Sequence, residues 1–202
     1  MERYQGAFPP GDVSRAEAVL LAELRALLGS RSVARGDFVL ASGMRSSYYI
    51  DARRTTMSAQ GLKLIGAVGL LALERQGWAP HAVGGLTLGA DPVAYAIALA
   101  SSDGPRPIDA FTVRKTAKEH GRGRRIEGAD IRNRDVVVVE DVITTGASAR
   151  SAIEAVRAEG GHVLGVLAVV DRLEGGRDAL EHDGHAVAAL VTVTELGLYP
   201  DS

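Results

Sequence analysis

The sequence contains no cysteine among its 202 residues. This absence excludes a disulfide framework and any metal site built from thiolates. No apolar run is long enough to cross a membrane, and residues 1–6 lack the apolar core of a signal peptide. We therefore expect a cytoplasmic protein that has no membrane partner.

Lysine is almost as scarce. Among the 23 basic residues only Lys63, Lys115 and Lys118 are lysines, and two of these three lie close together in the chain. The formal net charge of −2 gives no reason to expect nucleic acid as a partner. The segment from Lys115 to Lys118 is the one place where lysines cluster, and it therefore becomes a candidate for a specific role.

Length and composition indicate one globular domain over residues 1–202. Hydrophobic residues make up 46% and charged residues 24% of the chain, close to the averages of soluble proteins. A chain of this size fills one α/β domain well and is too short for two. Residues 1–30 predict an N-terminal amphipathic helix, with Val19, Leu20, Leu24, Leu27 and Leu28 on one face and a packing role only.

The most informative segment begins with four valines at positions 136–139. They show neither polar alternation nor a helical period, so they predict a strand that is buried on both faces. Glu140 and Asp141 follow where this strand reaches the surface. A short turn rich in hydroxyl groups then leads into a helix over residues 149–158.

This strand, turn and helix suit a sugar phosphate. Ligands of open α/β sheets bind at the carboxyl ends of the strands, where a helix start offers free N–H groups to an anion. Gly146 lets the backbone approach a phosphate, and Thr144, Thr145 and Ser148 supply hydroxyl donors. The acid pair would repel phosphate, so we expect it to accept hydrogen bonds from sugar hydroxyls. The alternative is a solvated strand end followed by an ordinary turn.

The remaining pattern alternates strands and helices, which predicts an α/β fold with a mainly parallel sheet and helices on both faces. Ser58 is expected to cap a helix that ends near Arg75. Short strands at 37–40 and 47–51 belong to a region, about 36–55, that we expect to form a small hood together with residues 186–198. Residues 174–185 are predicted to be a polar connection, with His182 and His185 in a turn and not in a metal site.

Residues 114–128 form a polar, glycine-punctuated segment without periodicity, typical of a mobile functional loop. The segment is basic, and its cationic residues are Arg114, Lys115, Lys118, Arg122, Arg124 and Arg125, with His120 as a further donor. One interpretation is a clamp for a small polyanion, and the other is a solvated surface loop. RNA is disfavoured because no aromatic residues interleave with the charges.

Two further places could contribute to the same crevice. The turn at 86–91, after Gly84-Gly85, is a candidate cradle for a second phosphate, or else a simple packing turn. Arg172 follows a buried strand at 162–171, so it should open beside Glu140 and Asp141. Its guanidinium matches a carboxylate, although pairing with Asp171 would be the simpler explanation.

The segment from Glu140 to Ser148 resembles the ribose-phosphate signature of the type I phosphoribosyltransferases, which use phosphoribosyl pyrophosphate (PRPP). The signatures of other phosphate loops, Gly-x-x-x-x-Gly-Lys-Ser/Thr and Gly-x-Gly-x-x-Gly, are absent. The Arg114-Lys115-x-x-Lys118-x-His120-Gly121 motif, Asp171-Arg172 and the segment from Ser42 to Arg53 are similar to the orotate phosphoribosyltransferase family. This resemblance extends from about residue 38 to residue 198.

The resemblance implies transfer of a phosphoribosyl group from PRPP to orotate, with Mg²⁺ held mainly through PRPP and no direct protein ligands. It implies catalytic roles for Lys118, Glu140 and Asp141. The implied PRPP-binding residues are Arg114, Lys115, Lys118, His120, Glu140, Asp141, Val142, Ile143, Thr144, Thr145, Gly146, Ala147 and Ser148, and those for orotate are Thr144, Arg172, Tyr49 and Ile50.

The family also implies a homodimer in which the loop at 114–128 reaches the neighbouring site. Two positions depart from some members, since Ala41 and Leu88 stand where those members have lysine. Two alternatives remain open. One is a phosphoribosyltransferase for another nucleobase, and the other is a regulator that senses PRPP without turning it over.

Overall fold

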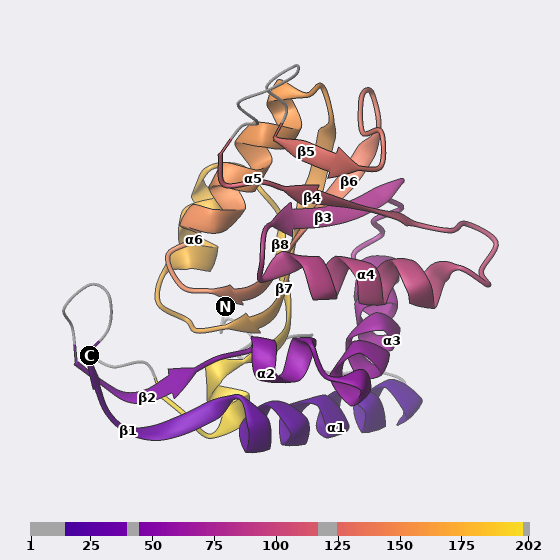
Figure 1. Ribbon diagram of the computed structural model, residues 1–202. Helices are drawn as coiled ribbons and strands as arrows, with labels where there is room; N and C mark the ends of the chain where they lie inside the picture. The colour runs from indigo at the N-terminus through magenta and orange to yellow at the C-terminus, as the bar shows by residue number, and fades with distance from the viewer. Residues whose placement is uncertain (1–14, 40–44, 117–124, 200–202) are drawn as a thin grey trace, which may run out of the picture.

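The computed structural model of the protein describes residues 15–39, 45–116 and 125–199 (Figure 1). At its centre lies a six-stranded sheet in the order β5-β4-β3-β6-β7-β8. The strands are β3 (Ala82–Leu86), β4 (Asp109–Val113), β5 (Ile126–Gly128), β6 (Asp135–Ile143), β7 (His162–Asp171) and β8 (Val187–Thr192). Every neighbouring pair is parallel except β4 and β5. The predicted mainly parallel sheet is confirmed.

Helices cover both faces of this sheet (Figure 1). One face carries α5 (Ala147–Ala158) and α6 (Gly176–His182), and the other carries α1 (Arg15–Arg31), α3 (Ala59–Arg75) and α4 (Ala90–Ser101). Successive side chains of a strand point to opposite faces. Accordingly Val137 and Val139 join the core on the α3–α4 side, whereas Val136 and Val138 pack on the α5 side. This double burial explains why the valine run lacks polar residues.

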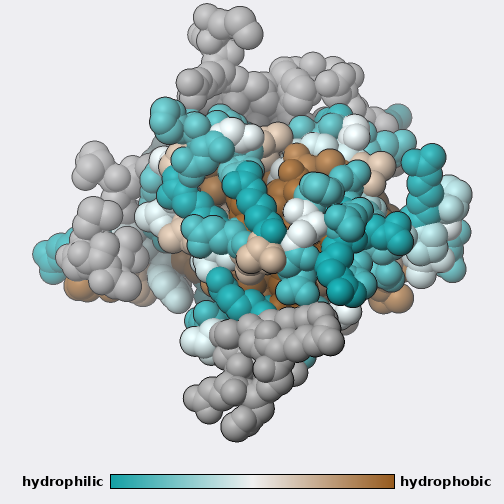
Figure 2. All heavy atoms as spheres, turned by 90° about the horizontal axis from the view of Figure 1, so that it is seen from above, coloured by the Kyte–Doolittle hydropathy of each residue, from teal (hydrophilic) through white to brown (hydrophobic). Residues whose placement is uncertain are grey.

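The helix starting after Ser58 forms as predicted. The Ser58 side chain accepts a hydrogen bond from the N–H of Gly61, 3.1 Å away, and the helix ends at Arg75. Within the described ranges no helix is long and apolar enough to cross a membrane. The face seen in Figure 2 is mostly hydrophilic, with a smaller hydrophobic area among the polar side chains.

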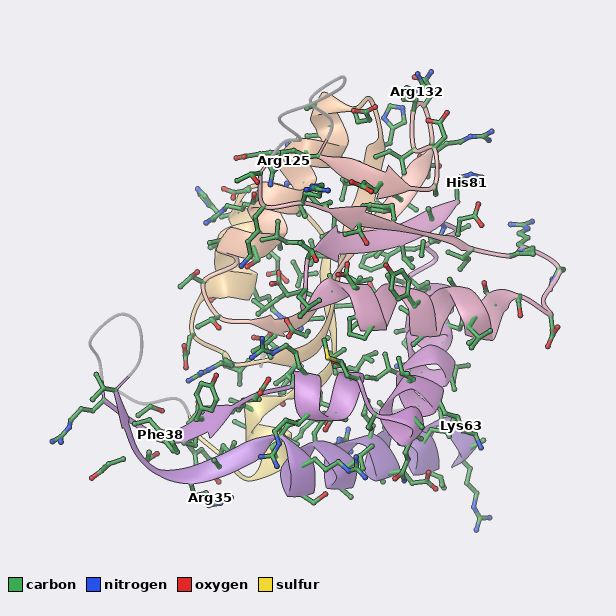
Figure 3. The ribbon with its side chains drawn as sticks, in the orientation of Figure 1. Arg35, Phe38, Lys63, His81, Arg125 and Arg132 are labelled. Carbon is green, nitrogen blue, oxygen red and sulfur yellow. The ribbon has the colours of Figure 1, made fainter. Side chains whose placement is uncertain are left out.

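A separate two-stranded sheet forms the hood. It pairs β1 (Val33–Val39) with β2 (Arg45–Ile50) in antiparallel fashion and continues into the short helix α2 (Arg53–Thr56). Figure 3 places Arg35 and Phe38 on this sheet, at the opposite end of the molecule from Arg132. The hood therefore lies apart from the β5 edge of the main sheet.

We expected residues 186–198 to belong to the hood. For the strand within this range, β8, that expectation was wrong. β8 pairs with β7 and forms the edge of the main sheet. Its residues 188–192 are buried, because α1 and α3 pack over one face and α6 over the other. The segment after β8 and η1 (Val193–Leu196) approaches the hood, because Arg35 Nη2 donates to the carbonyl oxygen of Gly197 at 3.2 Å.

Three other local predictions need correction. Residues 174–185 contain helix α6, so His182 ends a helix and does not lie in a turn. The segment 114–128 ends in strand β5 and is not loop throughout. In α1 the side chain of Val19 is exposed, and Leu21 joins Leu24, Leu27 and Leu28 in the core instead. The short elements α6 and β5 lack the length over which a periodicity can be recognised.

Candidate active site

A cavity of about 390 Å³ opens at the carboxyl ends of the strands of the main sheet. Its walls come from the hood, from the turn between β3 and α4, and from the ends of β6 and β7. The lining residues are Tyr49, Ile50, Asp51, Ala52, Arg53, Leu86, Thr87, Leu88, Gly89, Lys115, Glu140, Asp141, Val142, Thr144, Ser148 and Arg172. Segments that are far apart in sequence thus meet where the parallel strands end.

Glu140 and Asp141 form the floor of the cavity and turn to opposite sides of β6. Glu140 accepts hydrogen bonds from the Ser148 hydroxyl and the Ala149 N–H at the start of α5. Asp141 faces the β3–α4 turn, where a Cβ placed on Gly89 would lie 2.5 Å from Asp141 Oδ1. A side chain at position 89 would therefore displace the carboxylate, which explains the glycine there.

The two carboxyl groups hold their protons more tightly than free acids do. Burial raises the pKa of Glu140 to about 8, with a further contribution from the charge of Asp141. Burial also raises the pKa of Asp141, while the hydrogen bond from the Val142 N–H and the charge of Arg53 oppose that rise. Paired, buried acids in a cleft are typical of a functional site.

The turn after β6 has the shape expected of an anion cradle. Gly146 adopts the left-handed conformation with φ of 78°, and α5 begins at the next residue. Thr144 and Ser148 line the cavity, whereas Ile143 is buried in the core below it. Thr145 and Ala147 lie in the same turn and are exposed. The positive end of the α5 dipole therefore lies beside the acid pair.

The hood contributes an ion pair to the cavity wall. Arg53 Nε donates to Asp51 Oδ1 at 2.9 Å, and both residues line the cavity. The pair raises the pKa of Arg53, mainly through the hydrogen bond with Asp51, and the charge of Asp141 adds to the effect. Tyr49 and Ile50, the residues predicted to cover a planar ring, line the same wall.

Arg172 enters the cavity from the end of β7, where its side chain is nearly buried. It does not pair with Asp171, the simpler explanation considered above. Its Nε donates instead to Glu174 Oε1 at 2.8 Å, and Asp171 Oδ2 accepts from Arg177 Nε at the same distance. The guanidinium also lies 5.0 Å from the ring centroid of Tyr48 in the hood.

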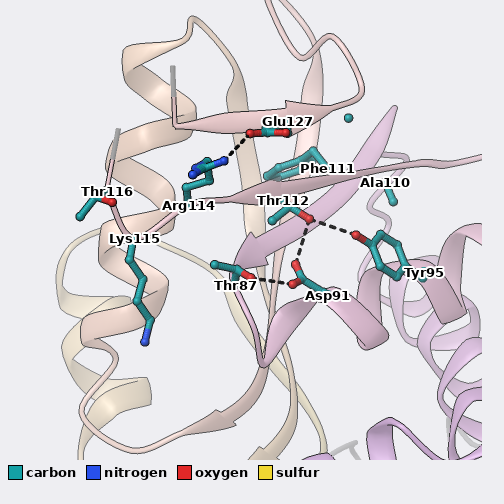
Figure 4. Close-up of a pocket in the computed structure, with 11 residues that line it drawn as sticks. Thr87, Asp91, Tyr95, Ala110, Phe111, Thr112, Arg114, Lys115, Thr116 and Glu127 are labelled. Atoms are coloured by element: carbon teal, nitrogen blue, oxygen red, sulfur yellow. Dashed lines mark hydrogen bonds and ion pairs between the residues drawn. The ribbon is translucent and has the colours of Figure 1, made fainter. Parts of the chain in front are cut away.

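A second cavity, of about 550 Å³, adjoins the first and shares Thr87 and Lys115 with it (Figure 4). Asp91 accepts hydrogen bonds there from the hydroxyls of Thr87 and Thr112. Arg114 Nη1 donates to Glu127 Oε1 at 2.9 Å, so Arg114 faces this second cavity and not the acid pair. Of the loop residues that the structure describes, Lys115 alone lines the acid-pair cavity.

Most of the predicted site residues therefore meet in one cavity. Those that do so are Tyr49, Ile50, Lys115, Glu140, Asp141, Val142, Thr144, Ser148 and Arg172. Lys118, His120 and Ala41 lie outside the described residues. No role in the site was predicted for Asp51, Arg53 or Glu174, whereas Asp91 lies in the turn at 86–91 that was predicted as a possible phosphate cradle. The Asp51-x-Arg53 spacing was the only available signal for the first two.

The comparisons with known proteins agree with this geometry. Residues 77–189 match the model of the family described as the phosphoribosyl transferase domain. A curated relative, the orotate phosphoribosyltransferase of Mycobacterium avium, is 47% identical over 178 residues, which cover 88% of this chain and 97% of the relative.

Solved structures extend the likeness to three dimensions. The orotate phosphoribosyltransferase of Mycobacterium tuberculosis H37Rv superposes with a TM-score of 0.78 at 45% identity, covering 89% of this chain and 99% of that one. The same enzyme in complex with PRPP gives a TM-score of 0.74 at 42% identity, with the same coverage. Since family model, curated relatives and solved structures coincide, the chain belongs to the orotate phosphoribosyltransferase family of phosphoribosyltransferases.

Proposed function

We propose that this protein transfers the 5-phosphoribosyl group from PRPP to orotate, giving orotidine 5′-monophosphate and pyrophosphate in pyrimidine biosynthesis. The observation that carries the proposal is the meeting of the acid pair, the phosphate turn and Arg172 in one cavity. These three groups match, in order, the ribose hydroxyls and the 5-phosphate of PRPP and the anionic base.

Glu140 and Asp141 act on the sugar. As the bond between C1 of the ribose and the pyrophosphate oxygen breaks, its electron pair leaves with the pyrophosphate and positive charge grows on the ring. Carboxylates that accept hydrogen bonds from the ribose hydroxyls favour that charge, and the growing positive charge in turn favours ionisation of Glu140, whose pKa burial raises to about 8. Their burial beneath the hood strengthens the effect, because electrostatic interactions are stronger in a site from which water is excluded.

The leaving pyrophosphate gains negative charge at the same time. Lys115, Arg114, Lys118 and His120 are the groups that we assign to neutralise it. Support comes from Lys115, which lines the acid-pair cavity next to the β3–α4 turn. Leu88, which replaces a lysine found in some members, leaves this neutralisation to the loop.

The other ends of the substrates bind in the same cavity as the acid pair. The 5-phosphate takes its hydrogen bonds from the turn over residues 144–148 at the start of α5. The carboxylate of orotate faces Arg172, with Thr144 beside it, and the Tyr49-Ile50 segment covers the ring. A new bond from the base nitrogen to C1 of the ribose completes the transfer.

We infer that PRPP would carry Mg²⁺ into the cavity mainly through its pyrophosphate, without a direct protein ligand. The oxygen-rich cavity fits this arrangement, since Mg²⁺ prefers oxygen ligands and retains several of its waters. When bound, the ion supplies further neutralisation of the leaving group. Among the described residues no cluster of three acidic, histidine or cysteine side chains could hold a metal by itself.

We also propose a homodimer in which each loop serves the neighbouring cavity. Arg114 supports this arrangement because it points away from the acid pair of its own chain, toward the second cavity. Tyr95, which lines the second cavity, and Leu99, one turn further along α4, are more than half exposed and offer apolar surface that a second copy would cover. Size-exclusion chromatography with light scattering should give twice the chain mass.

A subunit-mixing experiment tests the shared site. Lys118→Ala and Asp141→Asn subunits are each expected to be nearly inactive. If the loop acts across the dimer, mixed dimers contain one site with both native residues, and activity should return on mixing. Activity that equals the mean of the two separate variants would contradict the shared site.

The reaction itself is tested by following the absorbance of orotate in the presence of PRPP and Mg²⁺. We expect consumption of orotate and none of uracil or hypoxanthine, because Arg172 matches an anionic base. Consumption of another base would favour a phosphoribosyltransferase of different specificity. Binding of PRPP without turnover of any base would favour a sensing regulator.

A further inference from the structure

Glu174 occupies one edge of the Arg172 guanidinium. Glu174 Oε1 lies 2.8 Å from Nε and 2.6 Å from Nη2 of Arg172. These two nitrogens share the side edge of the planar guanidinium, so a single carboxylate oxygen covers that edge. What remains for a ligand is the Nη1 side, and Arg172 lines the acid-pair cavity.

The backbone between the two residues makes this contact possible. Leu173 has a positive φ of 57°, in the left-handed region that non-glycine residues seldom adopt. Asp171 Oδ1 accepts from the Leu173 N–H at 2.9 Å, and Asp171 Oδ2 is held by Arg177. The tight turn that results brings the side chains of residues 172 and 174 together.

The flat face of the guanidinium is held as well. The Tyr48 ring, from β2 of the hood, lies beneath it at 5.0 Å and is only 1% exposed. Arginine stacks well on aromatic rings, and such a contact is stronger when it is desolvated. The contact of Glu174 with the edge of the guanidinium and that of Tyr48 with its face together restrict the position and the rotation of Arg172.

We propose that Glu174 is a positioning residue that sets the specificity for an anionic base by aiming Arg172 at the base carboxylate. The inference rests on the proposed function, in which Arg172 receives that carboxylate. Without Glu174 only the Tyr48 ring, among the described residues, holds the guanidinium, so it can turn in its own plane and the Nη1 side no longer points at a fixed place. Orotate binding then weakens, whereas the PRPP-binding parts of the cavity, which Glu174 does not touch, stay as they are.

The test compares Glu174→Ala with Glu174→Gln and with Glu181→Ala in steady-state kinetics. Glu181 is an exposed acid on α6, so its variant removes the same charge at a distance from the cavity. For Glu174→Ala we expect the KM for orotate to rise about tenfold, with the KM for PRPP within about twofold of the parent value. Glu174→Gln retains an oxygen acceptor for Nε and Nη2, so it should stay within about threefold of the parent for both substrates.

An unchanged orotate KM in Glu174→Ala would overturn the proposal, and so would an equal rise in both KM values. A Gln variant as impaired as the Ala variant would also contradict a role in orientation. If Glu174→Ala does not fold, Glu174→Asp replaces it, because the shorter side chain cannot reach both nitrogens. These outcomes are separate from the proposed function, which fails only if the unaltered protein does not consume orotate.

Discussion

Thr112, at the end of β4, donates its hydroxyl to the carboxylate of Asp91 at the start of α4, across 2.9 Å. The same carboxylate accepts from Thr87 in the β3–α4 turn at 2.7 Å (Figure 4). Asp91 therefore joins the turn that lines the acid-pair cavity to the strand that leads into Arg114 and Lys115. One of these segments begins the loop to which we assign the pyrophosphate, and the other lines the acid-pair cavity beside it.

We expect Asp91→Ala to raise the KM for PRPP about tenfold, because the turn and the loop start lose their common anchor. Asp91→Asn keeps hydrogen-bonding groups and should be affected less. Asp103→Ala, which removes an exposed acid from the α4–β4 connection, is the control and should resemble the parent. A PRPP KM that is unchanged in Asp91→Ala would show that the anchor is not needed.

The raised pKa of Glu140 predicts a pH-dependent stability. Because the folded-state pKa is about 8 and the ordinary value is 4.5, the folded protein binds the proton more tightly than the unfolded chain between these two values. The presence of Glu140 therefore costs stability progressively as the pH rises from 4.5 to about 8. Glu140→Gln removes the cost, so it should unfold at higher denaturant concentration than the parent at pH 8.

The size of this effect is on the order of a few kcal/mol at pH 8 and close to zero below pH 4.5. Urea unfolding of parent and Glu140→Gln at several pH values measures the difference directly. A stability gain that is the same at every pH would show that ionisation of Glu140 is not its cause. The variant should lose activity even as it gains stability.

Trp78, the single tryptophan of the chain, packs against β7, so its fluorescence depends on the packing there. A Cβ added to Gly165 in β7 would collide with the Trp78 ring. Gly165→Ala should therefore displace the ring, cost about 1–3 kcal/mol and alter the tryptophan fluorescence. In contrast, a Cβ on Gly29 near the end of α1 meets no atom within 4 Å, so Gly29→Ala should leave the fluorescence unchanged and stabilise the protein slightly. Equal effects of the two variants would contradict this account.

The start of α3 offers a test of local stability away from the cavity. Ser58→Ala removes the hydroxyl that accepts from the Gly61 N–H, and the expected cost is about 1 kcal/mol in the free energy of unfolding. Ser102→Ala removes an exposed hydroxyl from the end of α4 and should cost much less. Thermal unfolding of both variants compares them, and turnover should be unaltered in each.

The sequence predicted best the parts of the molecule that are continuous in the chain. The valine run, the acid pair and the turn to α5 form one uninterrupted stretch, so their arrangement follows from local rules about strands and helix starts. Burial of Val136–Val139 on both faces was correctly inferred because a strand between two helical layers needs apolar residues at every position.

The errors that affect the hood and the site concern contacts between distant parts of the chain. The apolar run of β8 would suit a buried strand in the hood as well as one in the main sheet, and periodicity does not choose the partner. Glu174 was assigned to a polar connection because neither the left-handed Leu173 nor the resulting contact with Arg172 has a sequence signature. Asp51 and Arg53 meet Asp141 only after the hood folds over β6, about 90 residues away in the chain.

The alternation along β6 has one more consequence. A one-residue insertion or deletion within the strand would point Glu140 toward the β3–α4 turn and Asp141 toward α5, and it would exchange the valines between the two hydrophobic layers. The packing of the valines and the placement of the two acids in the cavity would then be lost together. We therefore expect length variation among relatives to be confined to connections such as residues 102–108, while the spacing between the strand start and the acid pair stays constant.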